Sequence, residues 1–171
     1  MKKFELTSES IVKFGRKLYR IRALVAFGDV EEGELGGFLE KEENLSQDGN
    51  AWVSENATVR GNATVSGDAT VRGDATVYGN ATVSENAWVF KTSHYLVIGP
   101  VGSRNGFTTF FRTKNLFIGV SCGCFRGNID EFVEKVKKTH GDAKHAKTYL
   151  AAAELAKMQI DLTPEENEPE E

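Results

Sequence analysis

Apolar and polar positions follow a fixed six-residue period between residues 50 and 91. Seven consecutive copies read NAWVSE, NATVRG, NATVSG, DATVRG, DATVYG, NATVSE and NAWVFK. The second position of every copy is Ala and the fourth is Val, whereas polar, glycine and aromatic residues occupy the others. A short fixed period is typical of repeat architectures in which each copy packs on its neighbours. The pattern therefore predicts stacked short strands with Ala and Val inside.

Two inward positions per copy, one large and one small, predict a narrow parallel β-helix with three flat faces. Each copy supplies a strand and a corner, so three copies, about eighteen residues, complete one turn. Asn or Asp precedes each Ala and Gly closes four copies, which suits corners that need positive φ. Residues eighteen apart should then stack. Trp52, Thr70 and Trp88 are expected in one outward column, and Arg60 and Tyr78 in another.

The flanking segments predict a cap at each end of the repeats. Residues 1–36 contain alternating strand patterns and are expected to form an N-terminal β cap over the first copies. The repeat region is expected to span 37–92, because its first residues resemble degenerate copies. Residues 93–160 predict a C-terminal α+β cap. The Pro- and Glu-containing segment 161–171 has the composition of a disordered acidic tail.

Within the C-terminal cap, strands are predicted at 95–98, 107–112 and 116–120, with a glycine-rich loop at 99–106. The expected fold class is therefore mainly β, with a left-handed parallel β-helix between the two caps.

Two helices are expected to close the C-terminal cap. Asn128 is a suitable N-cap for the first, with Glu131 at the capping-box position, and Gly141 is expected to end it. Asp142 is expected to start the second helix, which should run to about Ile160.

Size and charge set limits on the function. The chain has 171 residues and a mass of 18.8 kDa, and no apolar run reaches the roughly 20 residues of a membrane span. No signal-peptide pattern opens it, so a cytoplasmic location is expected. The formal net charge of −4 argues against a general nucleic-acid binder. This argument is weakened because the tail 161–171 carries much of the negative charge.

The order of segments resembles a known family. The segments IGPVGSRN, TTFFRTK, CGCFRG, IDEFVEKV and THGD follow the repeats at residues 98–142. Together with the repeats they resemble small hexapeptide-repeat proteins of the left-handed parallel β-helix type, found in bacteriophages and prophages of Gram-positive bacteria. The resemblance implies the fold and a genetic setting, and no activity comes with it.

A possible anion site lies after the repeats. Glycines allow close backbone approach, hydroxyl and amide groups supply donors, and arginines supply positive charge, a combination that suits phosphate or carboxylate. The predicted ligand-binding residues are Ser103, Arg104, Asn105, Thr108, Thr109, Arg112 and Arg126. The alternative is a turn-rich connection whose arginines pair with Glu on the helices.

Aromatic residues on the repeats predict an interface. Trp52, Tyr78, Trp88 and Phe90 occupy outward positions of the copies, and aromatic side chains often anchor protein contacts. Flat faces favour self-association, so a homotrimer is expected, with a homodimer as the second choice.

The histidines and cysteines are candidates for other chemistry. β-Helix acyltransferases use a catalytic His near the repeats, and His94 alone stands there, as a candidate base or as an exposed junction residue. Cys122 and Cys124 are candidate zinc ligands with His140 or His145. Their spacing departs from the usual CxxC, and two positions on one strand face also suit small core residues.

The sequence thus favours a non-catalytic, oligomeric phage accessory protein. We expect it to bind or sequester a small anionic, nucleotide-like ligand or a host protein, with no cofactor and no metal, and to counter a host defence in this way. The alternatives are an acyltransferase-like enzyme using His94 and a purely structural assembly protein.

Overall fold

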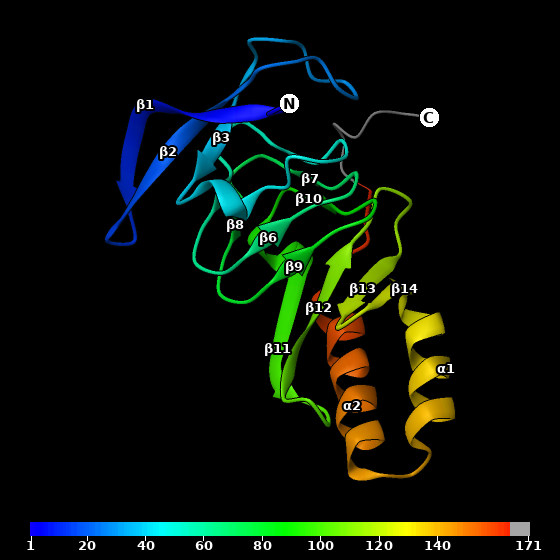
Figure 1. Ribbon diagram of the computed structural model, residues 1–171. Helices are drawn as coiled ribbons and strands as arrows, with labels where there is room; N and C mark the ends of the chain where they lie inside the picture. The colour runs from blue at the N-terminus through cyan, green and yellow to red at the C-terminus, as the bar shows by residue number, and fades with distance from the viewer. Residues whose placement is uncertain (165–171) are drawn as a thin grey trace.

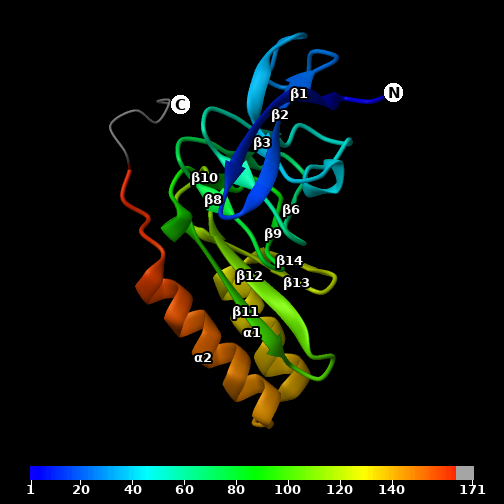
Figure 2. The same cartoon turned by 90° about the vertical axis from the view of Figure 1, so that its left-hand side faces the viewer.

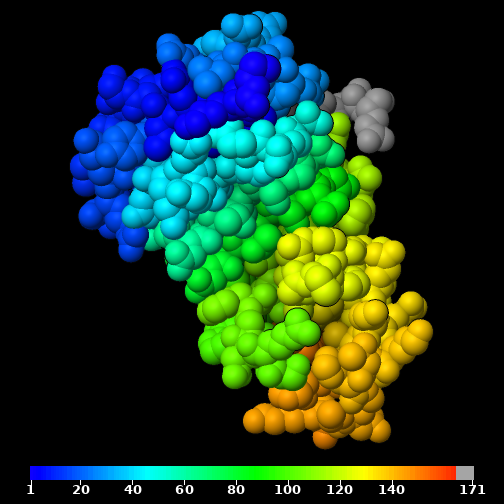
Figure 3. Space-filling view, viewed as in Figure 1, coloured from blue at the N-terminus to red at the C-terminus, as the bar shows by residue number. Residues whose placement is uncertain are grey.

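The computed structural model describes residues 1–164 and is mainly β, with two helices at the C-terminal end (Figure 1). The N-terminal strands lie at one end, the repeats in the middle, and the two helices at the other end (Figure 3). Among the described residues no helix is long and apolar enough to cross a membrane. Most of the predicted acidic tail, residues 165–171, lies outside the described residues.

The repeats form seven strands of two residues each. They are β4 (Trp52–Val53), β5 (Thr58–Val59), β6 (Thr64–Val65), β7 (Thr70–Val71), β8 (Thr76–Val77), β9 (Thr82–Val83) and β10 (Trp88–Val89). Each pairs in parallel with the strand three copies away, in the orders β4-β7-β10, β5-β8 and β6-β9. The expected eighteen-residue register is confirmed, since Thr58 pairs with Thr76. Every Ala and Val of the seven copies is at most 1% exposed, as predicted.

The corners of the repeats are also stacked. Asn50 donates to Asp68, eighteen residues on, over 2.9 Å, and two further ladders repeat this contact. Four copies end in glycines of positive φ, a conformation that glycine adopts without a steric penalty because it has no Cβ. Two copies instead end in glutamates of positive φ, Glu55 (φ 57°) and Glu85 (φ 55°).

The N-terminal segment covers the first copies. Strands β1 (Phe4–Lys13) and β2 (Arg16–Ala23) form an antiparallel hairpin, and β3 (Leu35–Leu39) joins β2 to β5 of the repeats. The side chain of Lys3 is buried and its amine donates to the carbonyls of Gly49 (3.2 Å) and Ala51 (2.9 Å). Carbonyls at the open end of the stack thus gain a donor.

An antiparallel sheet covers the other end of the stack. It contains β11 (Tyr95–Val101), β12 (Gly106–Arg112), β13 (Ile118–Cys122) and β14 (Phe125–Asn128), in that order. Its two faces differ, as strand alternation requires. Phe111 packs in the core of the repeats, whereas Phe110 and Val120 pack with the helices. Half of the predicted loop 99–106 is strand, because β11 continues to Val101 and β12 begins at Gly106, so that only residues 102–105 turn.

Side chains of the C-terminal segment accept hydrogen bonds from backbone N–H groups of the last repeats. The backbone N–H of Thr76 donates to the hydroxyl of Thr92 (3.0 Å), and that of Thr82 to the hydroxyl of Thr109 (2.9 Å). No further copy follows to accept these bonds, so the side chains replace it.

The helices α1 (Ile129–His140) and α2 (Lys144–Gln159) lie against one face of the sheet (Figure 2). The capping box between Asn128 and Glu131 is confirmed, with bonds of 2.9 Å in both directions. Gly141 ends α1 with φ 55°, also as predicted. The second helix starts later than expected, with Ala143 rather than Asp142 at its N-cap.

Candidate functional site

The structure does not bring the seven predicted ligand residues together. Ser103, Arg104 and Asn105 are exposed at the turn between β11 and β12. Arg112 stands at the opposite end of β12. Arg126, on β14, donates to the carbonyls of Gly123 (2.8 Å) and Phe125 (2.7 Å). A single anion site made of all seven is therefore wrong.

Three of the seven residues are buried and serve the fold. The Thr108 hydroxyl donates to the Cys122 sulfur (3.2 Å), and Thr109 accepts the bond from the repeats described above. Arg112 is 0% exposed, donates to the carbonyl of Thr163 (3.2 Å) and lies over the ring of Phe90. They are inaccessible because β12 is covered by the repeats on one face and by the helices on the other.

Ser103 and Arg104 instead line a cavity of about 320 Å³, which we call the hairpin pocket. It lies between the β11–β12 turn, the β13–β14 turn and the two helices. Aromatic side chains and two cationic side chains, one Arg and one Lys, line it. Within residues 1–164 no carboxylate belongs to this lining. The residues that give it this character are Arg104, Lys135, Phe107, Phe125, Phe132 and Tyr149.

The polar inner wall of the hairpin pocket is formed by Tyr149 and Cys122. The Tyr149 hydroxyl lies so close to Gly102 that a Cβ there would be only 1.8 Å from it. Burial raises the pKa of Tyr149, and interaction with Cys122 raises it further. The phenol therefore remains a neutral hydrogen-bonding group at physiological pH. His140 contacts the Tyr149 ring, with centroids 5.8 Å apart.

The cysteines do not form a metal site with the histidines. Cys122 and Cys124 are free thiols at the β13–β14 turn. His140 and His145 lie beside one another, with ring centroids 6.1 Å apart. In the part of the chain that the structure describes, no group of three or more His, Cys, Asp or Glu side chains is arranged to hold a metal ion.

His94, the alternative catalytic base, is 2% exposed rather than an exposed junction residue. Its Nδ1 accepts a long bond from the Phe90 N–H (3.5 Å), and its ring packs edge-on against Phe90 at 4.5 Å. A general base must reach its substrate. This position does not favour acyl transfer by His94.

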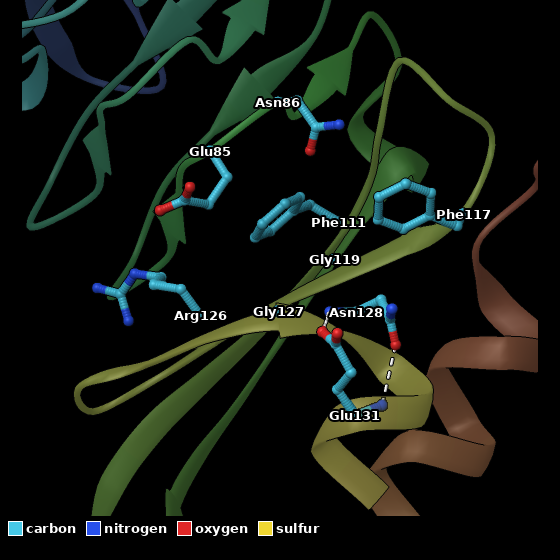
Figure 4. Close-up of a pocket in the computed structure, with 9 residues that line it drawn as sticks. All are labelled: Glu85, Asn86, Phe111, Phe117, Gly119, Arg126, Gly127, Asn128 and Glu131. Atoms are coloured by element: carbon cyan, nitrogen blue, oxygen red, sulfur yellow. Dashed lines mark hydrogen bonds between the residues drawn. The ribbon is translucent and has the colours of Figure 1, made fainter.

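A second cavity lies where the last copies meet the C-terminal sheet, and we call it the junction pocket. It has a volume of about 300 Å³. Phe111 and Phe117 line it above the strand that carries Gly119, and Glu85 and Glu131 lie on opposite sides of the Phe111 ring (Figure 4). The guanidinium of Arg126 points away from the two rings. Of the predicted ligand residues, only Arg126 belongs to this lining.

The predicted aromatic interface is only partly exposed. Trp52 is 4% exposed, because its ring packs edge-on against Phe27 of the N-terminal segment. Trp88 and Phe90 are half-buried. Tyr78 is 44% exposed and stacks with the guanidinium of Arg60 at 4.4 Å. Trp52, Thr70 and Trp88 are paired in one column as expected, but this column does not form an exposed aromatic face.

Sequence reasoning missed an exposed apolar group beside Tyr78. Phe14, at the tip of the β1–β2 hairpin, is 60% exposed and contacts the same Arg60 guanidinium at 4.8 Å. Val12 on the same hairpin is 77% exposed. The signal was an aromatic residue before Gly15 in an otherwise polar turn. We call Val12, Phe14 and Tyr78 the hairpin-tip patch.

Comparison with known proteins identified no relative of this chain among protein-family models or curated proteins.

Proposed function

We propose that the chain is a non-catalytic, oligomeric binding protein that holds a small anionic, nucleotide-like ligand in the hairpin pocket. The observation that carries this proposal is the lining of that pocket. Arg104 and Lys135 supply two positive charges with no lining carboxylate among the described residues, and aromatic rings supply apolar walls. Such walls suit a planar base, while the cations suit a phosphate.

We propose further that the repeats form a left-handed parallel β-helix and that the protein is a phage or prophage accessory acting inside a bacterial host. The parallel pairing of strands eighteen residues apart supports the first part. The resemblance of the segments that follow the repeats supports the second. Sequestering a phosphorylated signal would give such a protein a role against host defence, and binding a host protein is its second possible role.

Self-association belongs to the same proposal. Three exposed side chains make up the hairpin-tip patch, two of them aromatic rings that share the Arg60 guanidinium, and exposed aromatic residues often anchor protein contacts. We propose that this patch, rather than the buried Trp52, anchors contacts between copies. A homotrimer is the first choice and a homodimer the second. Native mass spectrometry of wild-type protein and of Phe14→Ser should show a stable oligomer and its loss.

Ligand binding is tested by calorimetry with nucleoside mono- and diphosphates and with inorganic phosphate. We expect nucleotides to bind and phosphate alone to bind far more weakly, because the aromatic walls contribute. The double variant Arg104→Ala/Lys135→Ala should lose at least tenfold in affinity. Lys138→Ala is the matched control, since Lys138 is exposed on α1 and does not line the pocket. Equal affinity in the double variant and the control would reject the hairpin pocket as the site.

A further inference from the structure

The turn between β13 and β14 carries two thiols on the wall of the hairpin pocket. Cys122 ends β13 and pairs with Phe125, the first residue of β14. Only Gly123 and Cys124 make the turn between them. Both cysteines are free thiols that line the pocket. Cα atoms two residues apart in a tight turn lie about 5–6 Å from each other, within the range that a disulfide spans. The backbone of this turn thus brings the two thiols within reach of one another.

The two thiols differ in access and in contacts. Cys124 is exposed, and within residues 1–164 its side chain makes no hydrogen bond. Cys122 is half-buried, and its sulfur accepts the bond from the Thr108 hydroxyl (3.2 Å) and contacts the Tyr149 hydroxyl. An exposed thiol next to a second, partly covered thiol is the arrangement in which oxidation of the first is resolved by the second. The pair therefore has the order of access that reversible oxidation requires.

The turn is open to reagents, yet its backbone is held in place. A Cβ on Gly123 would meet no atom within 4 Å, so the outer side of the turn is unobstructed. Arg126 donates to the carbonyls of Gly123 (2.8 Å) and Phe125 (2.7 Å), the residues on either side of Cys124. A small reagent can therefore reach Cys124 from solvent while the backbone around it keeps its position.

We propose that this pair is a reversible oxidation site, at which a peroxide joins Cys122 to Cys124 and thereby lowers the affinity of the hairpin pocket for its ligand. With hydrogen peroxide, the Cys124 sulfur attacks one oxygen, the O–O bond breaks, and a sulfenic acid and one water form. The Cys122 sulfur then attacks the Cys124 sulfur, and the sulfenic oxygen leaves as a second water. The two thiols lose two electrons and two protons, and the peroxide is reduced to two waters. A disulfide across a single residue is strained, so thiols reduce it easily.

The disulfide acts on the pocket through the Cys122 sulfur. This sulfur turns toward Cys124 and away from Thr108 and Tyr149, so the hydroxyl on the inner wall of the pocket loses its partner. Thr108 is 0% exposed, and its hydroxyl is left buried without an acceptor. The inner wall then rearranges, and we expect nucleotide affinity to fall at least tenfold. By linkage, bound nucleotide opposes formation of the disulfide by the same factor. This effect rests on the ligand role proposed above, whereas formation of the disulfide does not.

The test treats full-length protein with hydrogen peroxide and measures both the state of the thiols and nucleotide affinity. Trypsin releases both cysteines in one peptide, residues 115–126, whose mass distinguishes a disulfide from two free thiols. We expect the disulfide in this peptide, its reversal by dithiothreitol, and at least tenfold weaker binding of adenosine and guanosine diphosphates while it is present. Cys124→Ser removes only the exposed thiol, so its nucleotide affinity should not respond to peroxide. Oxidation of Met158, which is 78% exposed, serves as the internal measure of peroxide exposure.

Three results overturn the proposal. The first is a peptide 115–126 that keeps two free thiols at a peroxide concentration that oxidises Met158. The second is a disulfide that joins two copies of the chain instead of the two cysteines of one copy. The third is a disulfide within one copy that leaves nucleotide affinity unchanged. If the reduced protein binds neither nucleotide, the proposed function fails and the effect on affinity fails with it, while the mass of the peptide still decides the oxidation site.

Discussion

The repeats and the C-terminal sheet use similar residues in different ways. In the repeats, the inward Ala and Val of each copy stack on those of the copy three places away, so one copy predicts the burial of these two positions in all. In the sheet, Thr108 and Thr109 are adjacent yet face opposite layers, one toward the helices and the other toward the repeats. Periodicity therefore predicts burial in the first region, whereas burial in the second depends on which layers cover the strand.

The largest effect should come from the core of the repeats. Val71 is 0% exposed in the middle strand of β4-β7-β10, with a copy packed on either side. Val71→Ala should lower the free energy of unfolding by about 2 kcal/mol, through lost burial and the cavity left behind. Urea denaturation measures it, and Thr70→Ala, half-exposed on the same strand, should change it by less than about 0.5 kcal/mol. Equal losses of unfolding free energy in both variants would contradict the prediction that Val71 is an inward core position and Thr70 an outward one.

A smaller loss is expected where the two regions meet. Thr109→Val keeps the shape of the side chain but removes the oxygen that accepts the Thr82 N–H. The unfolding free energy should fall by about 1–2 kcal/mol, because a buried donor loses its partner. Nucleotide affinity of the hairpin pocket should stay unchanged. A loss of affinity without a loss of stability would instead restore the ligand role that the sequence suggested for Thr109.

The N-terminal cap can be tested by pH. Burial lowers the pKa of Lys3 to about 8, from about 10.5 in the unfolded chain, and Asp48 opposes this only in part. Between these values the unfolded state binds more protons, so stability should rise with pH. We expect a gain of about 1 kcal/mol from pH 7.5 to 9.5, with the amine partly hydrated. Denaturation of Lys3→Met should show no such gain, and an equal gain would assign the effect to another group.

Prediction from the sequence was strongest where local signals suffice. The strand register of the repeats, the capping box at Asn128 and the stop at Gly141 all depend on residues close in sequence or on a strict period. The burial of Trp52 could not be predicted, because its cover is Phe27, from a segment without a repeat pattern. Arg112 was misassigned for a similar reason. Its charge suggested a ligand, and its burial depends on the covering layers.

The candidate sites show the same limit. Arg104 was identified from its loop, but Lys135 and Tyr149 come from two helices that only the tertiary fold brings to it. Glu85 was visible in the sequence as a departure from glycine at the end of a copy. The sequence does not show how Glu85 differs from Glu55, which also replaces glycine but whose carboxylate accepts a bond from the Gly73 N–H and pairs with Arg72.

The comparison of Glu85 with Glu55 gives the smallest expected effect, and it separates the cost of the left-handed backbone conformation from the contribution of side-chain contacts. Glu85→Gly should raise the free energy of unfolding by about 0.5–1 kcal/mol, because relief of the left-handed conformation exceeds the added entropy of an unfolded glycine. Glu55→Gly relieves the same strain but loses the bond from Gly73 and the pair with Arg72, so its net change should be near zero or negative. Thermal denaturation of the two variants side by side measures the difference. If Glu85→Gly is the less stable of the two, the Glu85 side chain stabilises the fold by more than its left-handed conformation costs.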